Sequence, residues 1–216
     1  MRVVWVLRCF VLVVPVVLLA GACTGSDATP NLSSVAPASH SSSVASASVM
    51  PSASVGYPAD VPLTGHNVRP GERPPVYPAA ARVHSQAGAN AFAEFFMRTL
   101  DWAYATTNPS YMKHYYGPTC GLCNGIATGI AKTAAERHWY EGGRLSIRSS
   151  RDAAIGAVTA PASYCTTVVV DIGTTSVTDR TGKIITGQGA LPDQSFKLCE
   201  NLDVTAWRVT YFVGTT

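Results

Sequence analysis

The chain has 216 residues, with 16 Lys and Arg against 13 Asp and Glu. We expect Arg2 and Arg8 to be removed with a signal peptide, which leaves 14 basic and 13 acidic residues. A chain this close to neutrality offers no electrostatic basis for binding nucleic acid or an acidic substrate, so neither is expected as a partner.

Residues 1–22 have the pattern of a secretory signal peptide, with Arg2 and Arg8 in a basic start followed by an apolar run from Cys9 to Ala20. This run is shorter than the roughly 20 residues that span a membrane. Leu19-Ala20-Gly21-Ala22-Cys23 resembles the lipobox of bacterial lipoproteins, although the usual Leu is displaced by one position. The resemblance implies that Cys23 carries a lipid anchor on the extracytoplasmic face of the cell membrane. The alternative is an ordinary cleaved signal in which Cys23 has no such role.

Residues 23–86 are predicted to be a disordered tether. Residues 24–54 contain eleven serines, and the stretch from Tyr57 to Tyr77 is rich in proline. Such a segment has too little large apolar side-chain area to offset the entropy that is lost on ordering. The remaining residues, 87–216, are enough for a single domain with its own core.

Apolar residues at helical spacing predict a first helix over residues 89–107, and Asn108-Pro109 ends it and begins a short second helix. A third helix is predicted from Gly121 to Tyr140, ended by Gly142-Gly143.

After this glycine pair the pattern alternates and predicts strands. They are expected at residues 144–148, 153–159, 164–177, 184–185, 195–200 and 206–213, with a turn at 178–183. Three helices followed by an antiparallel sheet indicate an α+β domain.

Cys165 and Cys199 are expected to form a disulfide. If the strands on either side of the turn pair antiparallel, these cysteines face each other when the hairpin is centred on Gly182, inside the predicted turn. Cross-strand neighbours lie at a distance that a disulfide accepts. The glycines and the proline between Thr186 and Pro192 could shift this register.

Cys120 and Cys123 form a Cys-x-x-Cys motif at the start of the third predicted helix. We interpret it as a structural disulfide of an exported protein. One alternative is a thiol redox site, because a helix N-terminus lowers the pKa of a thiol. A second is a zinc site that uses all four cysteines of the domain.

The domain contains no recognised nucleophile, metal, phosphate or dinucleotide motif, so no cofactor and no metal are expected. Asp101, Asp171 and His138 are the residues most able to serve a catalytic pocket. Each also has a simpler interpretation, as a surface, sheet-bonded or core residue.

The domain resembles the DUF6318 family of actinobacterial lipoproteins of unknown function. The resemblance covers roughly residues 70–213 and depends on short motifs that follow a proline-rich lead-in. These motifs are Gly88-Ala89-Asn90-Ala91-Phe92, Trp102-Ala103-Tyr104-Ala105, Cys120-x-x-Cys123, Tyr140-Glu141-Gly142-Gly143 and Trp207-Arg208-Val209. The order of elements also resembles the NTF2-like cone fold, which implies three helices packed on a curved antiparallel sheet with a pocket between them.

The leading hypothesis is a non-catalytic module, held at the membrane by its lipid anchor, that binds a small apolar ligand, a cell-wall component or another envelope protein. The candidate pocket-lining residues are Phe96, Trp102, Tyr104, Tyr116 and Trp139, and core packing is an alternative role for most of them. The competing hypotheses are an enzyme of the NTF2-like cyclase or hydrolase type, which would use a pocket carboxylate with His138, and a thiol redox protein. Fold alone does not choose among them.

Overall fold

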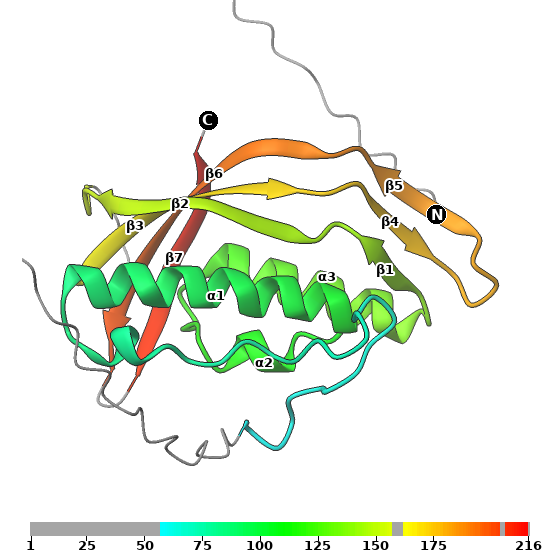
Figure 1. The fold of residues 1–216 in the computed structure, drawn as a ribbon, viewed down its shortest axis with the longest axis horizontal. Coiled ribbons are helices and arrows are strands. Elements are labelled where there is room, and N and C mark those ends of the chain that lie inside the picture. The colour runs from blue at the N-terminus through cyan, green and yellow to red at the C-terminus, as the bar shows by residue number, and fades with distance from the viewer. Residues whose placement is uncertain (1–56, 157–161, 204–205, 216) are drawn as a thin grey trace, which may run out of the picture. The chain divides into compact units, whose positions relative to one another are not determined.

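The computed structural model describes residues 57–156, 162–203 and 206–215 (Figure 1). The predicted signal peptide, Cys23 and the tether as far as residue 56 lie outside the described residues. So do positions 157–159 of the second predicted strand.

The helices are a 3-10 turn η1 (Ala79–Arg82), α1 (Gln86–Thr106), α2 (Ser110–Lys113) and α3 (Gly121–Ala135). Ser85 caps the start of α1, where its Oγ accepts a hydrogen bond from the Gly88 backbone N–H at 3.1 Å. The helix ends at Thr107, whose φ of 50° places it in the left-handed region. This termination agrees with the predicted boundary near Asn108.

The prediction that the third helix reaches Tyr140 is wrong, because α3 ends at Ala135. Arg137 adopts a φ of 58°, and the Arg137 and His138 N–H groups turn back to the carbonyls of Ala134 and Thr133. This is the hydrogen-bond pattern of a Schellman helix end, in which glycine is the usual left-handed residue. Because an arginine occupies that position here, the sequence carried no recognisable stop signal.

The strands are β1 (Trp139–Gly142), β2 (Leu145–Ala153), β3 (Tyr164–Ile172), β4 (Thr175–Thr178), β5 (Ile184–Gln188), β6 (Leu191–Leu202) and β7 (Trp207–Thr215). They form two antiparallel sheets, a three-stranded one in the order β1-β4-β5 and a four-stranded one in the order β2-β3-β6-β7. The predicted α+β class and antiparallel pairing are therefore confirmed.

The strand predicted over residues 164–177 is in fact two strands in different sheets. β3 pairs with β2 and β6, and after Gly173 and Thr174 the chain continues as β4, which pairs with β1 and β5. The chain returns through β5 of the three-stranded sheet and β6 of the four-stranded sheet. Both arms of the hairpin, β3–β4 and β5–β6, therefore pass from one sheet to the other (Figure 1). The first of the two strands expected before residue 164 is longer than predicted, because β2 runs from Leu145 to Ala153. The second, expected over residues 153–159, is wrong for its described part, because only Ala153 belongs to a strand and residues 154–156 do not.

The predicted register of the hairpin is confirmed where it matters for the disulfide. Cys165 faces Cys199, and the same register holds as far as Val170 opposite Gln194. The register shifts between Val170 and Ile172, outside the disulfide-bonded part. The disulfide itself is present, with its Cα atoms 4.0 Å apart.

Gly142 and Gly143, which we expected to end a helix, instead lie where the chain passes from β1 of the three-stranded sheet to β2 of the four-stranded sheet. Gly142 and Gly143 have φ values of 66° and 63°. A Cβ at Gly142 would collide with the Thr174 carbonyl, and one at Gly143 would collide with the Thr175 side chain. Gly143 N–H donates to Thr174 O at 2.8 Å, and Gly173 N–H donates to Arg144 O at 3.1 Å. We call residues 142–144 together with 173–174 the corner.

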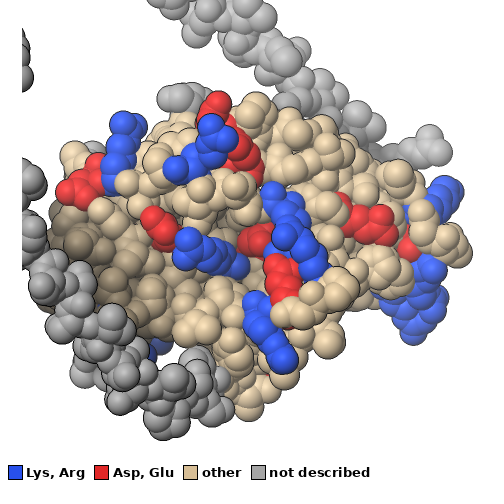
Figure 2. All heavy atoms as spheres, viewed as in Figure 1, with Lys and Arg blue, Asp and Glu red and all other residues tan. Residues whose placement is uncertain are grey.

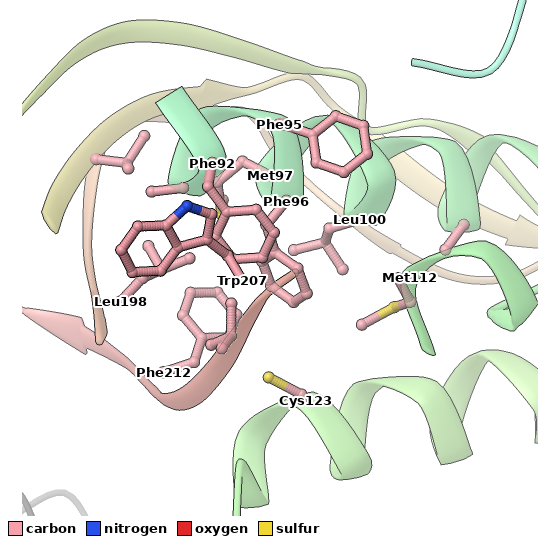
Figure 3. Packing of buried hydrophobic residues seen from close by; sticks show 14 of the residues in the cluster. Phe92, Phe95, Phe96, Met97, Leu100, Met112, Cys123, Leu198, Trp207 and Phe212 are labelled. Carbon is pink, nitrogen blue, oxygen red and sulfur yellow. The ribbon is translucent and has the colours of Figure 1, made fainter. Parts of the chain in front are cut away.

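The core lies between α1 and the four-stranded sheet (Figure 3). Trp207 of β7 stacks on Phe92 of α1 with the rings 6.4 Å apart, and Phe96 meets Phe212 edge to face. These aromatic side chains are fully or almost fully buried. Burying side chains of this size contributes much of the free energy that holds a helix on a sheet.

The prediction that the tether continues to residue 86 is wrong, because residues 57–86 are part of the folded unit. We call residues 57–78 the strap. Its carbonyl oxygens accept hydrogen bonds from core aromatic side chains, Pro62 O from Trp102 Nε1 at 2.9 Å and Pro75 O from Tyr111 Oη at 2.6 Å. The strap needs no core of its own, because an extended, proline-rich chain leaves its carbonyl groups free for donors from elsewhere.

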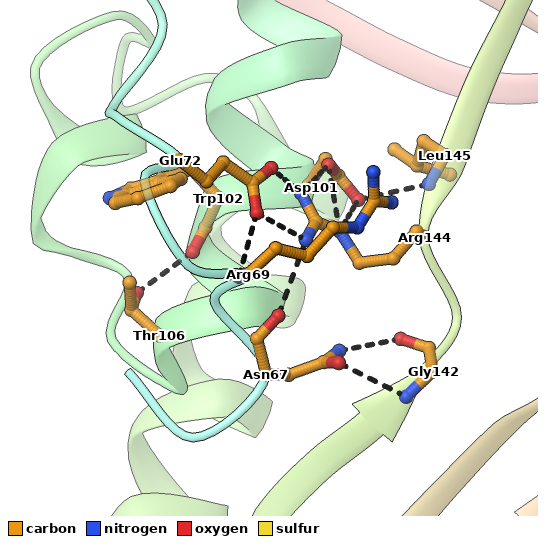
Figure 4. Close-up of polar contacts among 9 residues, drawn as sticks. All are labelled: Asn67, Arg69, Glu72, Asp101, Trp102, Thr106, Gly142, Arg144 and Leu145. Carbon is orange, nitrogen blue, oxygen red and sulfur yellow. Dashed lines mark hydrogen bonds and ion pairs between the residues drawn. The ribbon is translucent and has the colours of Figure 1, made fainter. Parts of the chain in front are cut away.

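Arg144 joins the strap to α1 and β2 (Figure 4). Its guanidinium contacts Glu72 of the strap and lies 2.7 Å from Asp101 of α1, and its Nη1 donates to Asn67 O at 3.2 Å. The Asn67 side-chain amide also donates to Gly142 O at 2.7 Å. The hydrogen bond from Arg144 lowers the pKa of the Glu72 carboxyl below its usual value. All three charged side chains are less than a quarter exposed, so this ion cluster is shielded from solvent.

We predict that Arg144→Met lowers the free energy of unfolding by about 2 kcal/mol or more, because it leaves two shielded carboxylates without a counter-charge. Arg148→Met, on the strand β2 that follows Arg144, is the matched control. Arg148 is 60% exposed and pairs with Asp171, so its removal should cost less than about 1 kcal/mol. Urea denaturation of both variants measures the difference, and equal losses would contradict a structural role for the Arg144 cluster.

Candidate functional site

An open groove lies between α3 and the strands that bend away from the main sheet. Its volume is about 620 Å³. The residues that line it come from α1, α3, β1, β4 and β5, and also from β2, β3, β6 and β7. The side chains that line it are mainly apolar: Met97, Leu100, Ile126, Leu145, Ile172, Val177, Ile185, Leu191, Phe196 and Phe212. We call this cavity the groove.

The groove follows from the change of sheet at the corner. β4 and β5 leave the four-stranded sheet, so their inner faces are not covered by α1 in the way that β2 and β3 are. All five residues of β5 are exposed, and Ile185, which lines the groove, is 50% exposed. Ile185 therefore adds apolar surface to a cavity whose lining is mainly apolar.

Polar groups gather near the α3 end of the groove. Tyr140 Oη lies 3.1 Å from Thr133 Oγ1, and the ring of Tyr140 meets that of Tyr104 edge to face at 4.8 Å. Burial raises the pKa of Tyr104 to about 12, so its hydroxyl stays protonated and able to donate a hydrogen bond at neutral pH. Lys132, Glu136 and His138 complete this end.

A second, shallower hollow of about 400 Å³ adjoins the groove. It is lined by His66, Thr106, Thr107, Ala134, Arg137, His138, Trp139 and Arg180. His138 lines both cavities, so they are neighbours. We call it the cationic hollow, because its only charged side chains that are ionised at every physiological pH are the two arginines.

The five candidate pocket residues divide into three groups. Tyr104 lines the groove and Trp139 lines the cationic hollow. Phe96 and Trp102 are buried in the core and line neither cavity. Tyr116 is half-buried, packs against the core, and pairs with Val209 in an isolated bridge. Trp102 and Tyr104 are two residues apart on α1 and so lie roughly 200° apart around the helix. Because α1 is buried on most of its sides, helical spacing indicated burial but could not show which buried side faces a cavity.

The three residues of the enzyme hypothesis are not brought together. Asp101 is held by Arg144 and by the Leu145 N–H. Asp171 accepts hydrogen bonds from Arg148 and from the Asp193 N–H, and neither carboxylate lines the groove. Only His138 does, and the carboxylate beside it is Glu136, with Oε2 3.6 Å from Nδ1. That distance is too long for the hydrogen bond that would orient a general base.

Cys120 and Cys123 form a disulfide, as expected, with Cα atoms 5.3 Å apart. Cys120 Sγ accepts the Cys123 N–H at 3.3 Å, so the pair caps the start of α3. Both cysteines are fully buried, which removes the access that thiol exchange requires. With all four domain cysteines in disulfides, none is left as a zinc-binding thiolate, and the described residues contain no group of side chains suited to a metal.

Glu200 is a buried acid that sequence reasoning missed. It lies on β6 with no exposed surface, and neither carboxyl oxygen has a hydrogen-bond partner among the described residues. Burial raises its pKa well above the usual value, which keeps the carboxyl protonated. The alternation Phe196, Leu198, Glu200 along the strand is the signal that could have found it, since all three lie at inward-facing positions.

We predict that Glu200→Gln changes how stability depends on pH. In the wild type the unfolded chain ionises above a pKa of 4.5 while the folded chain keeps the proton. The folded state then binds more protons, so stability is full below this pH and falls as pH rises, by up to about 1.4 kcal/mol per unit. Glutamine does not ionise, so the free energy of unfolding of the variant should rise relative to that of the wild type between pH 4 and pH 7. A constant difference in urea denaturation across this range would contradict the prediction.

The site is a partly enclosed groove between a helix and the bent strands of a disulfide-bonded α+β domain. Residues 66–212 match DUF6318, a family of unknown function, and the chain belongs to this family. The match begins inside the strap, in agreement with the fold. The sequence matches no curated protein.

A crystal structure of the intermembrane space region of the chloroplast protein ARC6 is similar, with 10% identity over 62% of this chain and 98% of that chain. The TM-score between the two structures is 0.42. Among the residues that the structure describes, none of the helices combines the length and the apolar character needed to cross a membrane.

Proposed function

We propose that this chain is a lipoprotein anchored to the extracytoplasmic face of the cell membrane, and that its domain binds an apolar ligand in the groove without catalysing a reaction. The observation that carries the proposal is the groove itself. Its volume of about 620 Å³ falls within the range of small-molecule sites, and its lining is mainly apolar, with polar side chains near the end of α3 and along β4 and β5. A cell-wall polymer or a flat protein surface would be less well matched to such a lining.

The fold class that we propose is the NTF2-like cone, in which a long helix lies inside a strongly curved sheet. The position of α1 under β2 and β3, and the bend of the hairpin over the groove, support this assignment (Figure 1). The placement of Asp101 and Asp171 away from the groove supports binding rather than catalysis.

The extracytoplasmic location is supported by covalent chemistry as well as by the signal-like residues 1–22. Both disulfides are buried, and disulfides of this kind persist in oxidising compartments. Charges of both signs are interspersed over the face seen in Figure 2, with wide uncharged areas between them. Such a surface supports attachment through a lipid rather than through electrostatic attraction to anionic headgroups.

We predict that Thr186→Trp blocks the groove. Thr186 lies on exposed strand β5, lines the groove, and pairs with Val177, which also lines it. Tryptophan is well suited to a strand and would fill part of the cavity. The affinity for the uncharged apolar dye N-phenyl-1-naphthylamine is measured by the fluorescence of the dye. It should fall at least about tenfold, which is the loss expected when the dye can no longer contact about one apolar side chain.

Ile184→Trp is the matched control on the same strand. Ile184 is 63% exposed and does not line the groove, so this variant should bind the dye as the wild type does. Wild-type affinity in Thr186→Trp would show that the groove is not the binding site.

We predict that Cys23→Ser releases the protein from the membrane fraction of a bacterial cell that expresses the full chain. The variant cannot receive the acyl chains that would hold the protein in the bilayer. Cys9→Ser, within the predicted signal peptide, is the control and should leave the protein in the membrane fraction. If the processed Cys23→Ser protein stayed membrane-bound, the anchor proposal would be wrong.

A further inference from the structure

The hydroxyl group of Tyr104 has no hydrogen-bond partner among the described residues, although its side chain lines the groove. The side chain is half-buried, and its ring is held by the edge-to-face contact with Tyr140. Its oxygen is not one of the unpartnered polar atoms that the protein encloses completely. A molecule in the groove can therefore reach this hydroxyl.

The neighbouring hydroxyl of Tyr140 is already used by the protein. Tyr140 Oη lies 3.1 Å from Thr133 Oγ1, and Thr133 Oγ1 donates to the Gly129 carbonyl at 3.1 Å. A threonine hydroxyl has a single proton, so Tyr140 is the donor in the bond to Thr133. The two tyrosines at this end of the groove therefore differ, because only Tyr104 keeps its proton for a ligand.

A wholly apolar ligand would waste the Tyr104 hydroxyl. Burial raises the pKa of Tyr104 to about 12, so the group is a hydrogen-bond donor throughout the physiological range. A hydrocarbon that covered it would exclude water and leave the donor unpaired, which costs free energy. An oxygen acceptor on the ligand would instead give the donor a partner.

The charged side chains at the same end of the groove disfavour an ionised ligand. Glu136 Oε1 lies 3.9 Å from Lys132 Nζ, and Glu136 Oε2 lies 3.6 Å from His138 Nδ1. An anionic head would meet the carboxylate of Glu136, and a cationic head would meet the ammonium of Lys132. Either head would also lose hydration to a lining that is mainly apolar.

We propose that the groove binds an uncharged, mainly apolar molecule that carries a carbonyl group, and that Tyr104 donates a hydrogen bond to the carbonyl oxygen. A carbonyl oxygen accepts this bond without bringing a proton that would need an acceptor of its own. The inference rests on the proposed function, and it adds the chemical class of the ligand and the residue that recognises it.

The test uses the full chain carrying Cys23→Ser, so that no attached lipid competes for the groove. The probes are 2-acetylnaphthalene and 2-ethylnaphthalene, which differ by a carbonyl in place of a methylene group. Their Kd values are measured by displacement of N-phenyl-1-naphthylamine. In Tyr104→Phe the Kd for the ketone should rise about fivefold, as expected for the loss of one neutral hydrogen bond, and the Kd for the hydrocarbon should not rise.

Tyr140→Phe is the matched control, because it removes a hydroxyl whose proton is already donated to Thr133. It should bind both probes as the wild type does. Infrared difference spectra give a readout that a change in packing alone would not move. The carbonyl stretching band of bound 2-acetylnaphthalene should lie at lower wavenumber in the wild type and in Tyr140→Phe than in Tyr104→Phe.

The charge of the ligand is tested in the wild type with 2-naphthoate, which carries an ionised carboxylate on the same ring system. Its Kd should exceed that of 2-acetylnaphthalene by about tenfold or more, because the carboxylate loses hydration in the groove. Equal or tighter binding of 2-naphthoate would overturn the assignment of a neutral ligand.

Wild-type affinity for the ketone in Tyr104→Phe would overturn the inference, and so would an equal loss for both probes or an unchanged carbonyl band. The proposed function would stand in each of these cases as long as Thr186→Trp still blocked the apolar dye. A wild type that bound neither the dye nor either naphthalene would instead overturn the proposed function, and the inference with it.

Discussion

The corner is the constraint on which the rest of this structure depends. There, the antiparallel pair β2–β3 of the four-stranded sheet gives way to the pair β1–β4 of the three-stranded sheet. Two hydrogen bonds hold the crossing, from Gly143 N–H to Thr174 O and from Gly173 N–H to Arg144 O. The left-handed conformations of Gly142 and Gly143, and the absence of a Cβ beside Thr174 and Thr175, make the crossing sterically possible. Without this crossing, β4 and β5 would continue the main sheet over α1, and no groove would form.

The charged cluster of Arg144 stabilises this corner and explains why a proline-rich segment is folded. Arg144 follows the glycine pair directly, and its guanidinium satisfies Glu72 of the strap and Asp101 of α1 together. Each charge is shielded, but each is paired and hydrogen-bonded, which is the condition under which a shielded charge is tolerated. Glu200 shows the other solution, because an acid with no partner stays protonated instead.

The two cavities follow from the same geometry. The groove is the space between the departing strands and α3, and the cationic hollow lies where the end of α3 meets the turn of that same hairpin. Arg137, in the left-handed position usually taken by glycine, follows the end of α3 and lines this hollow. Apolar and cationic surfaces therefore adjoin because one helix ends where one hairpin turns.

What the sequence determined by itself was local. The alternation of residues and the turn at Gly182 led to the correct prediction that Cys165 faces Cys199. The sequence did not reveal the two register shifts that lie between the turn and the disulfide, one between Val177 and Thr178 and one between Val170 and Ile172. The α+β class, the end of α1 near Asn108 and the disulfide of Cys120 with Cys123 followed in the same way, from spacing and composition within short stretches.

Only the tertiary structure decided which residues share a site. The strap was predicted as a tether because its own composition cannot form a core, yet its carbonyl groups are satisfied by Trp102 and Tyr111 from helices far along the chain. Tyr104 faces the groove while Trp102, two residues earlier, is buried in the core. Arg137 and Arg180 line the same hollow although they follow different elements, α3 and β4. Such contacts join residues that are distant in the sequence, so no local pattern of residues encodes them.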